Sequence, residues 1–367
     1  MKIAHVVSTF SPHIGGMGAV CFNEARLLAE KGHDVTVFTL KYPDFNYNDT
    51  NFPFKVVRLR PIIRFGDAGL VPQVLKYLKG FDLIHLHYPF YGGAEWLCFS
   101  SVPTVITYHM DAQAVGVKGV ISKIYDWFWP KILFAQAKKI IAISAEHFKN
   151  TKFGKDFSGK TVEIQNGVDT NVFSPHTADL DSLGLAHLKN KKIILFVGNP
   201  LPVKRLDLLL NSMKLLADNS LALVVVGEGY ELNKYKQMAK DLQIENDVYF
   251  AGQCDSQQKL SDYYNAAACV VVPSDYESFS LVAAEASVCG VPVVASNIPG
   301  MAGRIQNSVN GFLFEKGSAE SLAGALKKVI SMSTEERKSV GEKGRMEMET
   351  KYSWEQHMEK LTNLYGI

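Results

Sequence analysis

Short apolar runs rich in β-branched residues alternate with longer amphipathic segments along the whole chain. In the first half, the runs with the length and composition of strands are 3–7, 35–40, 55–59, 83–87, 104–108, 140–144 and 162–164. Helical periodicity separates several of them, as at 18–31. Strands that alternate with helices in this way predict an α/β fold with a parallel sheet.

The second half repeats this arrangement. Its strand candidates are 192–198, 222–227, 248–252, 269–274, 292–296 and 311–314, separated by helical patterns at 205–217, 230–242, 256–267 and 279–289. Between the halves, residues 170–191 contain Pro175, Gly184 and a lysine-rich end, which is typical of an interdomain linker. The segment 352–365 is an amphipathic helix with no strand after it. We therefore predict two doubly wound domains, at 1–172 and 173–350, and a C-terminal segment at 351–367.

Composition narrows the class of protein. A chain of 367 residues has room for two domains with separate cores, and a net charge of only +2 gives no general affinity for nucleic acid. The five cysteines are widely spaced and include no C-x-x-C pair, which argues against a disulfide framework and favours a reducing, cytoplasmic location. The first residues lack the long apolar core of a signal peptide, and no stretch approaches the roughly 20 apolar residues of a membrane span.

A glycine-rich turn follows the first predicted strand. Gly15, Gly16 and Gly18 open the helix pattern at 18–31. Glycines at a helix N-terminus let backbone N–H groups approach an oxyanion. The spacing is neither G-x-G-x-x-G nor a P-loop, so a purely structural turn is an equal alternative.

Two glutamates follow the strand at 269–274. Glu277 stands in the loop and Glu285 in the next helix, where a carboxylate can accept two hydrogen bonds from a vicinal diol such as that of ribose. Taken alone, both glutamates are more simply solvated surface residues. Ser278 or a neighbour can cap this helix, while Phe279, Ser280 and Leu281 offer unpaired backbone N–H groups to a phosphate.

The stretch "ESFSLVAAEASVCGVPVVAS" resembles the E-x7-E region of retaining family 4 glycosyltransferases, which have the GT-B fold. Further matches run in the order of that family: the Gly-Gly turn, "ITYHMD", "AISAEH", "QNGVD", "FVG" with its following lysine, "VVGEG", "FAGQ" and the closing Y-S-W helix. The resemblance covers nearly the whole chain. It implies two Rossmann-like domains that face each other across a cleft, with the C-terminal helix returning to the first domain.

The resemblance implies a role for each matching position. Glu285 is expected to bind the ribose hydroxyls of a nucleotide, Glu277 the hydroxyls of the transferred sugar, and Lys204 the diphosphate. Gly16, beside Gly15, is expected to bring its backbone amide to the same diphosphate. His109, at the end of the strand 104–108, matches the histidine beside the anomeric carbon, which stabilises developing charge. The expected catalytic residues are thus His109 and Glu277, and the other expected donor contacts are Gly198, Asn199, Arg205, Ser278, Phe279, Ser280 and Leu281.

One position departs from the family pattern. The family reads G-R-x4-K after this strand, whereas this chain has Gly198, Asn199 and then Lys204. The bidentate guanidinium that suits a phosphate is therefore missing, and Asn199 donates only neutral hydrogen bonds. Either donor affinity is reduced, or Arg205 restores a cation to the loop.

Two histidines lie two residues apart in "LIHLHYP". His85 and His87 share one side of a predicted strand, but no acidic or cysteine partner is near them in sequence, and the family is usually metal-independent. We therefore expect no metal and no cofactor, and we assign His85, His87 and Ser144 to the acceptor side.

The function that the resemblance implies is transfer of a hexose, with retention, from a UDP- or GDP-linked sugar to a hydroxyl acceptor, in glycolipid, polysaccharide or other glycoconjugate synthesis. A nucleotide-sugar epimerase or hydrolase on the same fold is one alternative. A nucleotide-sugar-binding protein with a decayed active site, suggested by Asn199, is another. The predicted partners are a nucleotide-sugar donor and a glycan or lipid acceptor, without nucleic acid.

Residues 58–79 combine basic with apolar side chains. Such a segment suits the surface of an anionic bilayer, and the resemblance implies a first-domain region that touches membranes in several lipid-glycosylating relatives. The alternative is a helix that packs into the core and exposes only a basic edge. The aromatic stretch "YDWFWPKILF" is either an acceptor wall or part of the core.

Overall fold

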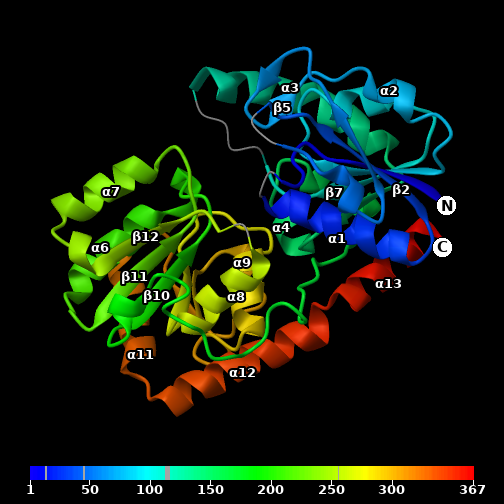
Figure 1. Ribbon diagram of the computed structural model, residues 1–367. Helices are drawn as coiled ribbons and strands as arrows, with labels where there is room; N and C mark the ends of the chain where they lie inside the picture. Colours follow the sequence, from blue (N-terminus) through cyan, green and yellow to red (C-terminus); the bar gives the residue numbers. More distant parts are fainter. Residues whose placement is uncertain (13–14, 44–45, 112–115, 255) are drawn as a thin grey trace. The chain divides into compact units, whose positions relative to one another are not determined.

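The computed structural model describes residues 1–12, 15–43, 46–111, 116–254 and 256–367. The chain divides into two compact units (Figure 1). Unit 1 comprises Met1–Asn166 and Glu355–Ile367, and unit 2 comprises Gly167–Trp354. The divisions fall six residues before and four residues after the boundaries suggested by sequence, 172/173 and 350/351.

Unit 1 contains a seven-stranded parallel sheet in the order β3-β2-β1-β6-β7-β8-β9. The interior strand β1 is buried on both sides, with Ile3, Ala4, His5 and Val6 all at 0% exposure, as expected for a parallel sheet covered by helices on each face. The strand bounds are β1 Lys2–Val6, β2 Asp34–Leu40, β3 Lys55–Leu59, β6 Leu83–Tyr88, β7 Thr104–Tyr108, β8 Lys139–Ala142 and β9 Thr161–Glu163.

Two different cores cover the faces of this sheet. Helices α1 (Gly16–Glu30) and α13 (Trp354–Tyr365) pack on one face, around residues such as Cys21, Leu28 and Leu361. They lie side by side in Figure 1, in blue and red. The other face carries an aromatic core that includes Tyr88 and Phe134. The further helices of unit 1 are α2 Val74–Tyr77, α3 Gly116–Gln136, α4 Ala145–Lys149 and α5 Gly154–Phe157.

Unit 2 has a six-stranded parallel sheet in the order β12-β11-β10-β13-β14-β15. The first strand of the unit, β10, lies between β11 and β13, so the chain changes direction across the sheet at this point. Ligands of doubly wound sheets bind at such a switch point, beyond the carboxyl ends of the strands. The strand bounds are β10 Lys192–Val197, β11 Leu221–Val226, β12 Val248–Gly252, β13 Cys269–Val272, β14 Val293–Ser296 and β15 Phe312–Phe314.

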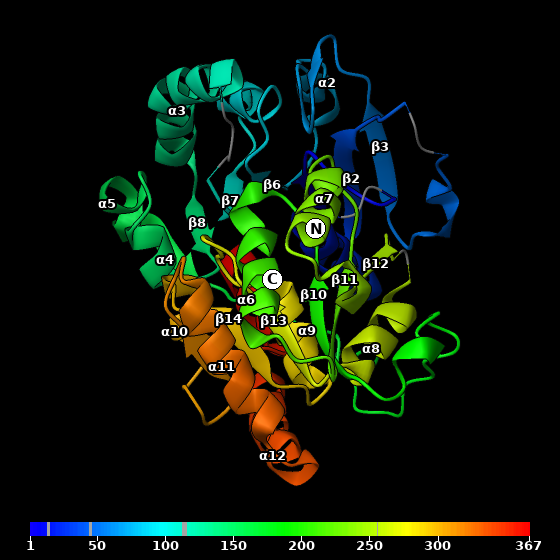
Figure 2. The same ribbon diagram turned by 90° about the vertical axis from the view of Figure 1, so that its left-hand side faces the viewer.

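Helices cover both faces of this second sheet. The aliphatic core of one face is completed by α6 (Leu206–Leu216), α7 (Leu232–Asp241) and α11 (Ala319–Ser331), of which α6 and α11 lie side by side (Figure 2). Helices α8 (Gln257–Ala266) and α9 (Leu281–Val288) lie on the opposite face (Figure 1). Helix α10 (Pro299–Ala302) follows β14, and the long α12 (Thr334–Lys351) packs against α9.

Serine caps define several of these helix starts. Ser256, Ser318 and Ser333 each accept a hydrogen bond from a backbone N–H in the first turn of α8, α11 and α12, at 3.3, 3.0 and 3.1 Å. Glu336 completes a capping box by accepting from the Ser333 backbone at 2.7 Å. Because these caps satisfy donors that the helix cannot, they fix where each helix begins.

The segment 58–79 does not form the core-facing helix that was one of the two alternatives. It forms a short antiparallel hairpin, β4 (Arg64–Phe65) and β5 (Ala68–Gly69), followed by the single turn of α2. The hairpin and its flanks leave Ile62, Ile63 and Phe65 exposed. Within the described ranges, no helix is long and apolar enough to cross a membrane.

Candidate functional site

The loops after β10 and β11 approach each other closely in unit 2. A Cβ on Gly227 would lie 2.2 Å from the Gly198 carbonyl oxygen, and a Cβ on Gly229 would lie 2.0 Å from Oδ1 of Asn199. The side chain of Asn199 therefore packs against a neighbouring loop where only glycine leaves room. This packing is enough to explain why residue 199 has a short side chain, whether or not a ligand contacts it.

Lys204 and Glu277 meet at this end of the sheet. Lys204 ends a short 3₁₀ turn after β10, and its Nζ lies 2.6 Å from Oε1 of Glu277 in the loop after β13. Ser274 donates to the same oxygen at 2.8 Å, and the Asp275 N–H donates to the Val203 carbonyl at 2.9 Å. The two loops are thus tied by backbone and side chain. Sequence placed both residues at the donor site, and the structure brings them into contact.

Arg205 is held by two carboxylates. Its guanidinium donates to Asp207 at 3.0–3.2 Å and to Asp275 at 3.1–3.2 Å. The hydrogen bond to Asp207 is the largest cause that raises the pKa of Arg205 above its ordinary value. Asp207 and Asp275 thus balance the charge of Arg205 in this structure, and a contact between Arg205 and the diphosphate stays a prediction.

Helix α9 begins beside Glu277. Ser280 precedes it with φ of +61° and caps it by accepting from the Ala283 N–H at 3.3 Å. A non-glycine residue in this region is strained, and such strain concentrates at functional sites. The ring of Phe279 stacks on the guanidinium of buried Arg304, at 4.1 Å. The backbone N–H groups of Leu281 and its neighbour lie in the first turn of α9, at the helix N-terminus that is predicted to bind a phosphate.

Glu285 lies in the second turn of α9. Burial raises the pKa of Glu285 to about 7, although the hydroxyl of Tyr264 donates to its Oε2 at 2.7 Å and acts to lower that pKa. The neighbours Ala284 and Ala286 are buried, and no second hydrogen bond to this carboxylate is present among the described residues. The carboxylate therefore retains acceptor capacity for a diol.

In unit 1, the glycine turn opens α1. Gly15 is extended, Gly16 is the first helical residue, and a Cβ on Gly18 would lie 2.8 Å from the Thr9 carbonyl oxygen. The N-terminus of a 15-residue helix therefore packs directly on the segment after β1. Ser144 has a local role, since it caps α4 by accepting from the His147 N–H at 3.2 Å, and its contact with an acceptor stays a prediction.

His109 belongs to a buried row of histidines. Its Nε2 lies 3.0 Å from Nδ1 of His87, whose Nε2 lies 3.0 Å from Nδ1 of His5. The row follows from strand register, because His5 pairs with His85 on β1 and β6, and His87 pairs with Thr107 on β6 and β7. Burial lowers the pKa of His109 and of His5 to about 3, so both are neutral near pH 7.

Glu24 of α1 faces this row from the covering helix. Burial acts to raise its pKa, but His85 and a hydrogen bond from His357 hold the pKa of Glu24 well below its ordinary value. The Nε2 of His357 lies 3.0 Å from Glu24 Oε1, and Tyr365 places its hydroxyl 2.5 Å from Nδ1 of His85. Helix α13 therefore contributes two polar groups to the core of unit 1, which accounts for its return to that unit.

The assignment of His85 and His87 to the acceptor needs correction. Both imidazoles have 0% exposure, and their partners are buried side chains of unit 1 rather than the surface. The lack of an acidic residue near His85 and His87 in sequence is no argument against a metal, because the fold brings Glu24 next to them. Sequence reasoning missed Glu24, His5 and His357. A polar residue recurring on the buried face of an amphipathic helix was the available signal.

The chain has two doubly wound parallel sheets, and the second sheet carries a lysine, two glutamates and a helix start at its switch point. This arrangement defines a two-domain α/β protein of the GT-B class. Residues 182–347 match the family model described as glycosyl transferases group 1, and residues 14–172 match glycosyltransferase family 4. The chain belongs to glycosyltransferase family 4.

Relatives of known sequence are glycosyltransferases, and solved structures share the fold. A D-inositol 3-phosphate glycosyltransferase of Streptosporangium roseum is 30% identical over 86% of this chain and 80% of its own. An uncharacterized glycosyltransferase of Methanocaldococcus jannaschii is 26% identical over 100% of this chain and 98% of its own. Sucrose-phosphate synthase of Thermosynechococcus elongatus shares the fold with a TM-score of 0.82, at 22% identity over 99% and 98%. HepE of Anabaena, in complex with UDP and glucose, shares the fold with a TM-score of 0.84, at 20% identity over 100% of this chain and 99% of that chain.

Proposed function

We propose that this glycosyltransferase takes a hexose from a UDP- or GDP-linked sugar and transfers it to a hydroxyl acceptor with retention of configuration. The observation that carries the proposal is the contact between Lys204 and Glu277 beside the start of α9, with Glu285 in the second turn of that helix. A cation for phosphate, a carboxylate for sugar hydroxyls and a second carboxylate for ribose are the groups that such a donor requires. The structures of HepE, which hold UDP or UDP-glucose, support a nucleotide-sugar donor.

The ion pair has a direct consequence for binding. Lys204 is 30% exposed and Glu277 is 11% exposed, so a ligand at this end of the sheet reaches the lysine first. A diphosphate competes with Glu277 for the ammonium, and the sugar hydroxyls then donate to the carboxylate that the lysine releases. Donor binding thereby exchanges one ion pair for two charge-assisted contacts, with the α9 start as an additional source of positive potential.

We assign no metal to the diphosphate in this proposal. Lysine, a helix N-terminus and backbone amides supply its counter-charge. His109 of unit 1 is proposed to stabilise charge that develops at the anomeric carbon. Its neutral imidazole acts by hydrogen bonding rather than by carrying a full positive charge. The leaving phosphate can accept the proton of the acceptor hydroxyl, so that no protein nucleophile is needed.

The first experiment is a thermal-shift panel of UDP, GDP, ADP and their sugars. A ligand that binds only the folded chain raises its melting temperature, which identifies the base and sugar. Lys204→Ala is expected to weaken binding of the selected donor by about 1–3 kcal/mol, since it removes a charged phosphate partner. Lys214→Ala, on an exposed lysine of α6, is the matched control. Equal donor affinity in wild type and Lys204→Ala would remove this donor site.

Turnover separates transfer from the two alternatives. Incubation of the donor with a panel of glycan and lipid acceptors is expected to give a glycosylated product whose anomeric configuration, read by NMR, equals that of the donor. Release of nucleotide and free sugar without any glycosylated acceptor would indicate a hydrolase. Donor binding without turnover would indicate a binding protein.

A further inference from the structure

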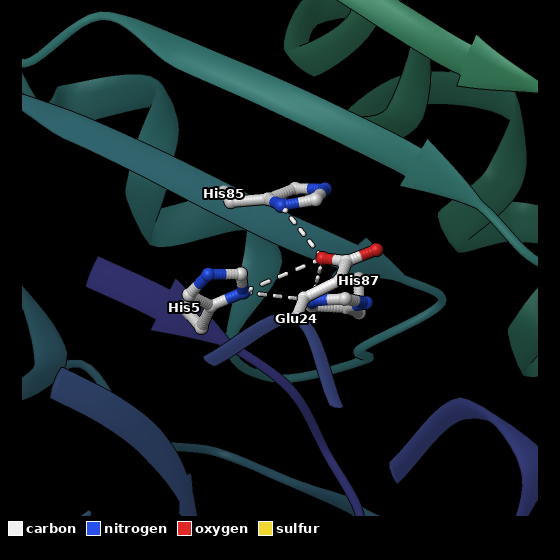
Figure 3. A group of neighbouring side chains, drawn as sticks. All are labelled: His5, Glu24, His85 and His87. Carbon is white, nitrogen blue, oxygen red and sulfur yellow. Dashed lines mark hydrogen bonds and ion pairs between the residues drawn. The ribbon is translucent and has the colours of Figure 1, made fainter. Parts of the chain in front are cut away.

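A cluster of three histidines and one glutamate lies in the core of unit 1 (Figure 3). His5 comes from β1, His85 and His87 from β6, and Glu24 from α1. Each side chain is 0% or 1% exposed. Apolar residues such as Ile3, Val7, Leu83 and Val105 surround the cluster on the same face of the sheet. Four polar side chains in such a layer require partners that satisfy one another or a shared ligand.

The four groups point at a common centre. Oε2 of Glu24 lies 3.8 Å from Nδ1 of His5, 3.2 Å from Nδ1 of His85 and 3.6 Å from Nε2 of His87. Dashed lines in Figure 3 mark these contacts. The two nitrogens of His5 and His87 lie 3.0 Å apart, and the candidate ligand atoms all lie within 4.8 Å of one another. In a tetrahedral zinc site with bonds of 2.0–2.2 Å, neighbouring ligand atoms are about 3.4 Å apart.

Two buried polar atoms of the cluster have no hydrogen bond. They are Oε2 of Glu24, which is the oxygen that faces the three imidazole nitrogens, and Nε2 of His5. Hydrogen bonding among the histidines therefore does not account for the carboxylate oxygen at the centre of the cluster. A cation between these atoms would satisfy it.

We propose that His5, Glu24, His85 and His87 bind one zinc ion in the core of unit 1. The ligand set of three imidazole nitrogens and one carboxylate oxygen suits a borderline metal such as zinc better than Mg²⁺ or Ca²⁺, which prefer oxygen ligands. All four positions are protein ligands, so the site is closed and structural. It links β1, β6 and α1 through residues that span 82 positions of the chain. The proposal does not depend on the donor site of unit 2.

The groups behind the ligands fit this arrangement. Nε2 of His85 lies 2.7 Å from Oγ1 of Thr107, and Oε1 of Glu24 faces Nε2 of His357 at 3.0 Å. Zinc ligands commonly have such outer partners, which fix the ring orientation and the tautomer. The Nδ1 of His87 contacts His109, so the ion would also fix the imidazole that we assign to catalysis.

Zinc binding changes two contacts. The Tyr365 hydroxyl, which is 2.5 Å from Nδ1 of His85, turns away from that lone pair. The proton shared by His5 and His87 leaves the ligand nitrogens, and Nε2 of His5 has no competing partner and can carry it. No net proton release is needed at this pair. Because the ligands are inaccessible to solvent, the ion enters while unit 1 folds rather than afterwards.

The test measures the metal directly. The chain is produced without a histidine tag in zinc-supplemented medium, dialysed against EDTA, denatured and assayed for released metal. We expect about one zinc per chain in wild type and in His187→Ala, which removes an exposed histidine of unit 2, and less than about 0.1 in Glu24→Gln and His5→Asn. Chain produced in cobalt medium is expected to show the visible absorption of tetrahedral Co²⁺.

Each outcome decides the proposal. Refolding wild type with zinc instead of EDTA is expected to raise its melting temperature by more than about 5 °C, and to leave Glu24→Gln unchanged. A wild-type circular dichroism spectrum and a cooperative melting transition in Glu24→Gln would show that this variant folds. Wild type with less than about 0.1 zinc per chain and no effect of zinc on refolding overturns the site, as does full zinc content in both ligand variants.

Discussion

If Glu285 binds the ribose as proposed, nucleotide binding depends on pH near neutrality. Burial raises the pKa of this carboxyl to about 7, against the hydrogen bond from Tyr264. A carboxylate that accepts two hydrogen bonds from a ribose diol must be ionised, so the proton leaves when the nucleotide binds. We predict that donor affinity increases as the pH rises through about 7 and levels off above about pH 8.

The size of the effect follows from that pKa. If the ligand binds only the ionised form, the apparent dissociation constant is multiplied by 1 + 10^(pKa − pH), which is about 11 at pH 6 and about 1.1 at pH 8 for a pKa of about 7. Affinity therefore weakens about tenfold between pH 8 and pH 6, or about 1.4 kcal/mol. His109 does not add to this change, because its pKa is lowered to about 3.

The assay is calorimetric titration with the nucleotide sugar that the thermal-shift panel selects. Such a diphosphate diester has no proton that titrates near neutrality, unlike a free nucleoside diphosphate. Glu285→Gln is expected to bind more weakly at pH 8 and to show no pH dependence. Glu315→Gln, on an exposed glutamate, is expected to keep the wild-type profile. Equal wild-type affinity at pH 6 and pH 8, or an undiminished pH dependence in Glu285→Gln, would refute the reasoning.

Four further outcomes are expected. Without ligand, Glu285→Gln melts at a higher temperature than wild type at pH 8 but not at pH 4. Because the pKa of Glu285 is raised, the folded chain binds one more proton than the unfolded chain between about pH 4.5 and pH 7, and wild-type stability falls as the pH rises through that range. Equal melting temperatures at pH 8 would contradict this. Arg205→Ala keeps the wild-type dissociation constant for the donor, because Asp207 and Asp275 already balance that guanidinium; a tenfold loss would restore Arg205 to the diphosphate site. Turnover persists after EDTA treatment of the folded chain, and added Mg²⁺ or Mn²⁺ does not raise it; complete loss that Mg²⁺ restores would place a metal at the diphosphate. The chain co-sediments with anionic but not with zwitterionic vesicles. Reversing the charges of Arg60 and Arg64 abolishes this co-sedimentation, whereas the control Lys31→Glu does not. Negligible sedimentation with both vesicle types would favour a soluble acceptor.

The surface behind the vesicle prediction is only partly the one that sequence suggested. Arg58 is not available to a lipid, since it donates to Asp49 at 2.6 Å and lies under the ring of Tyr47. Arg60 and Arg64 are exposed beside Ile62, Ile63 and Phe65. In unit 1, Trp127 is also 73% exposed and Phe128 is 48% exposed, whereas Leu133 and Phe134 of the same aromatic stretch are buried in the core, so only part of that stretch is available to an acceptor.

The sheets were predictable because their strands are buried on both faces. The strands β1 and β11 are continuous apolar runs, apart from Lys2 and His5 of β1, and short runs of this kind between helical patterns are typical of buried parallel strands. The hairpin β4–β5 was not predictable in the same way. Its strands contain two residues each, so they show no periodicity, and three large apolar side chains there are exposed.

The donor site and the histidine cluster differ in what sequence could reveal. Lys204 and Glu277 are 73 residues apart, and only the family resemblance placed them together. No motif linked His5 to Glu24. Their proximity depends on the register of β1 against β6 and on which side of α1 faces the sheet, and both are properties of the folded unit. A search for an acidic partner near His85 in sequence therefore could not find it.

Helix α13 shows why an amphipathic pattern alone understates such a core. Its buried stripe runs through His357, Leu361 and Tyr365, at intervals of four residues, and two of these three side chains are polar. His357 pairs with Glu24 and Tyr365 with His85, so each polar side chain of the stripe meets a polar group of the cluster. A buried carboxylate without such partners would be strongly destabilising. The helix that returns to unit 1 therefore compensates a buried charge as well as covering an apolar face, and its polar positions are set by Glu24 and His85 rather than by its own periodicity.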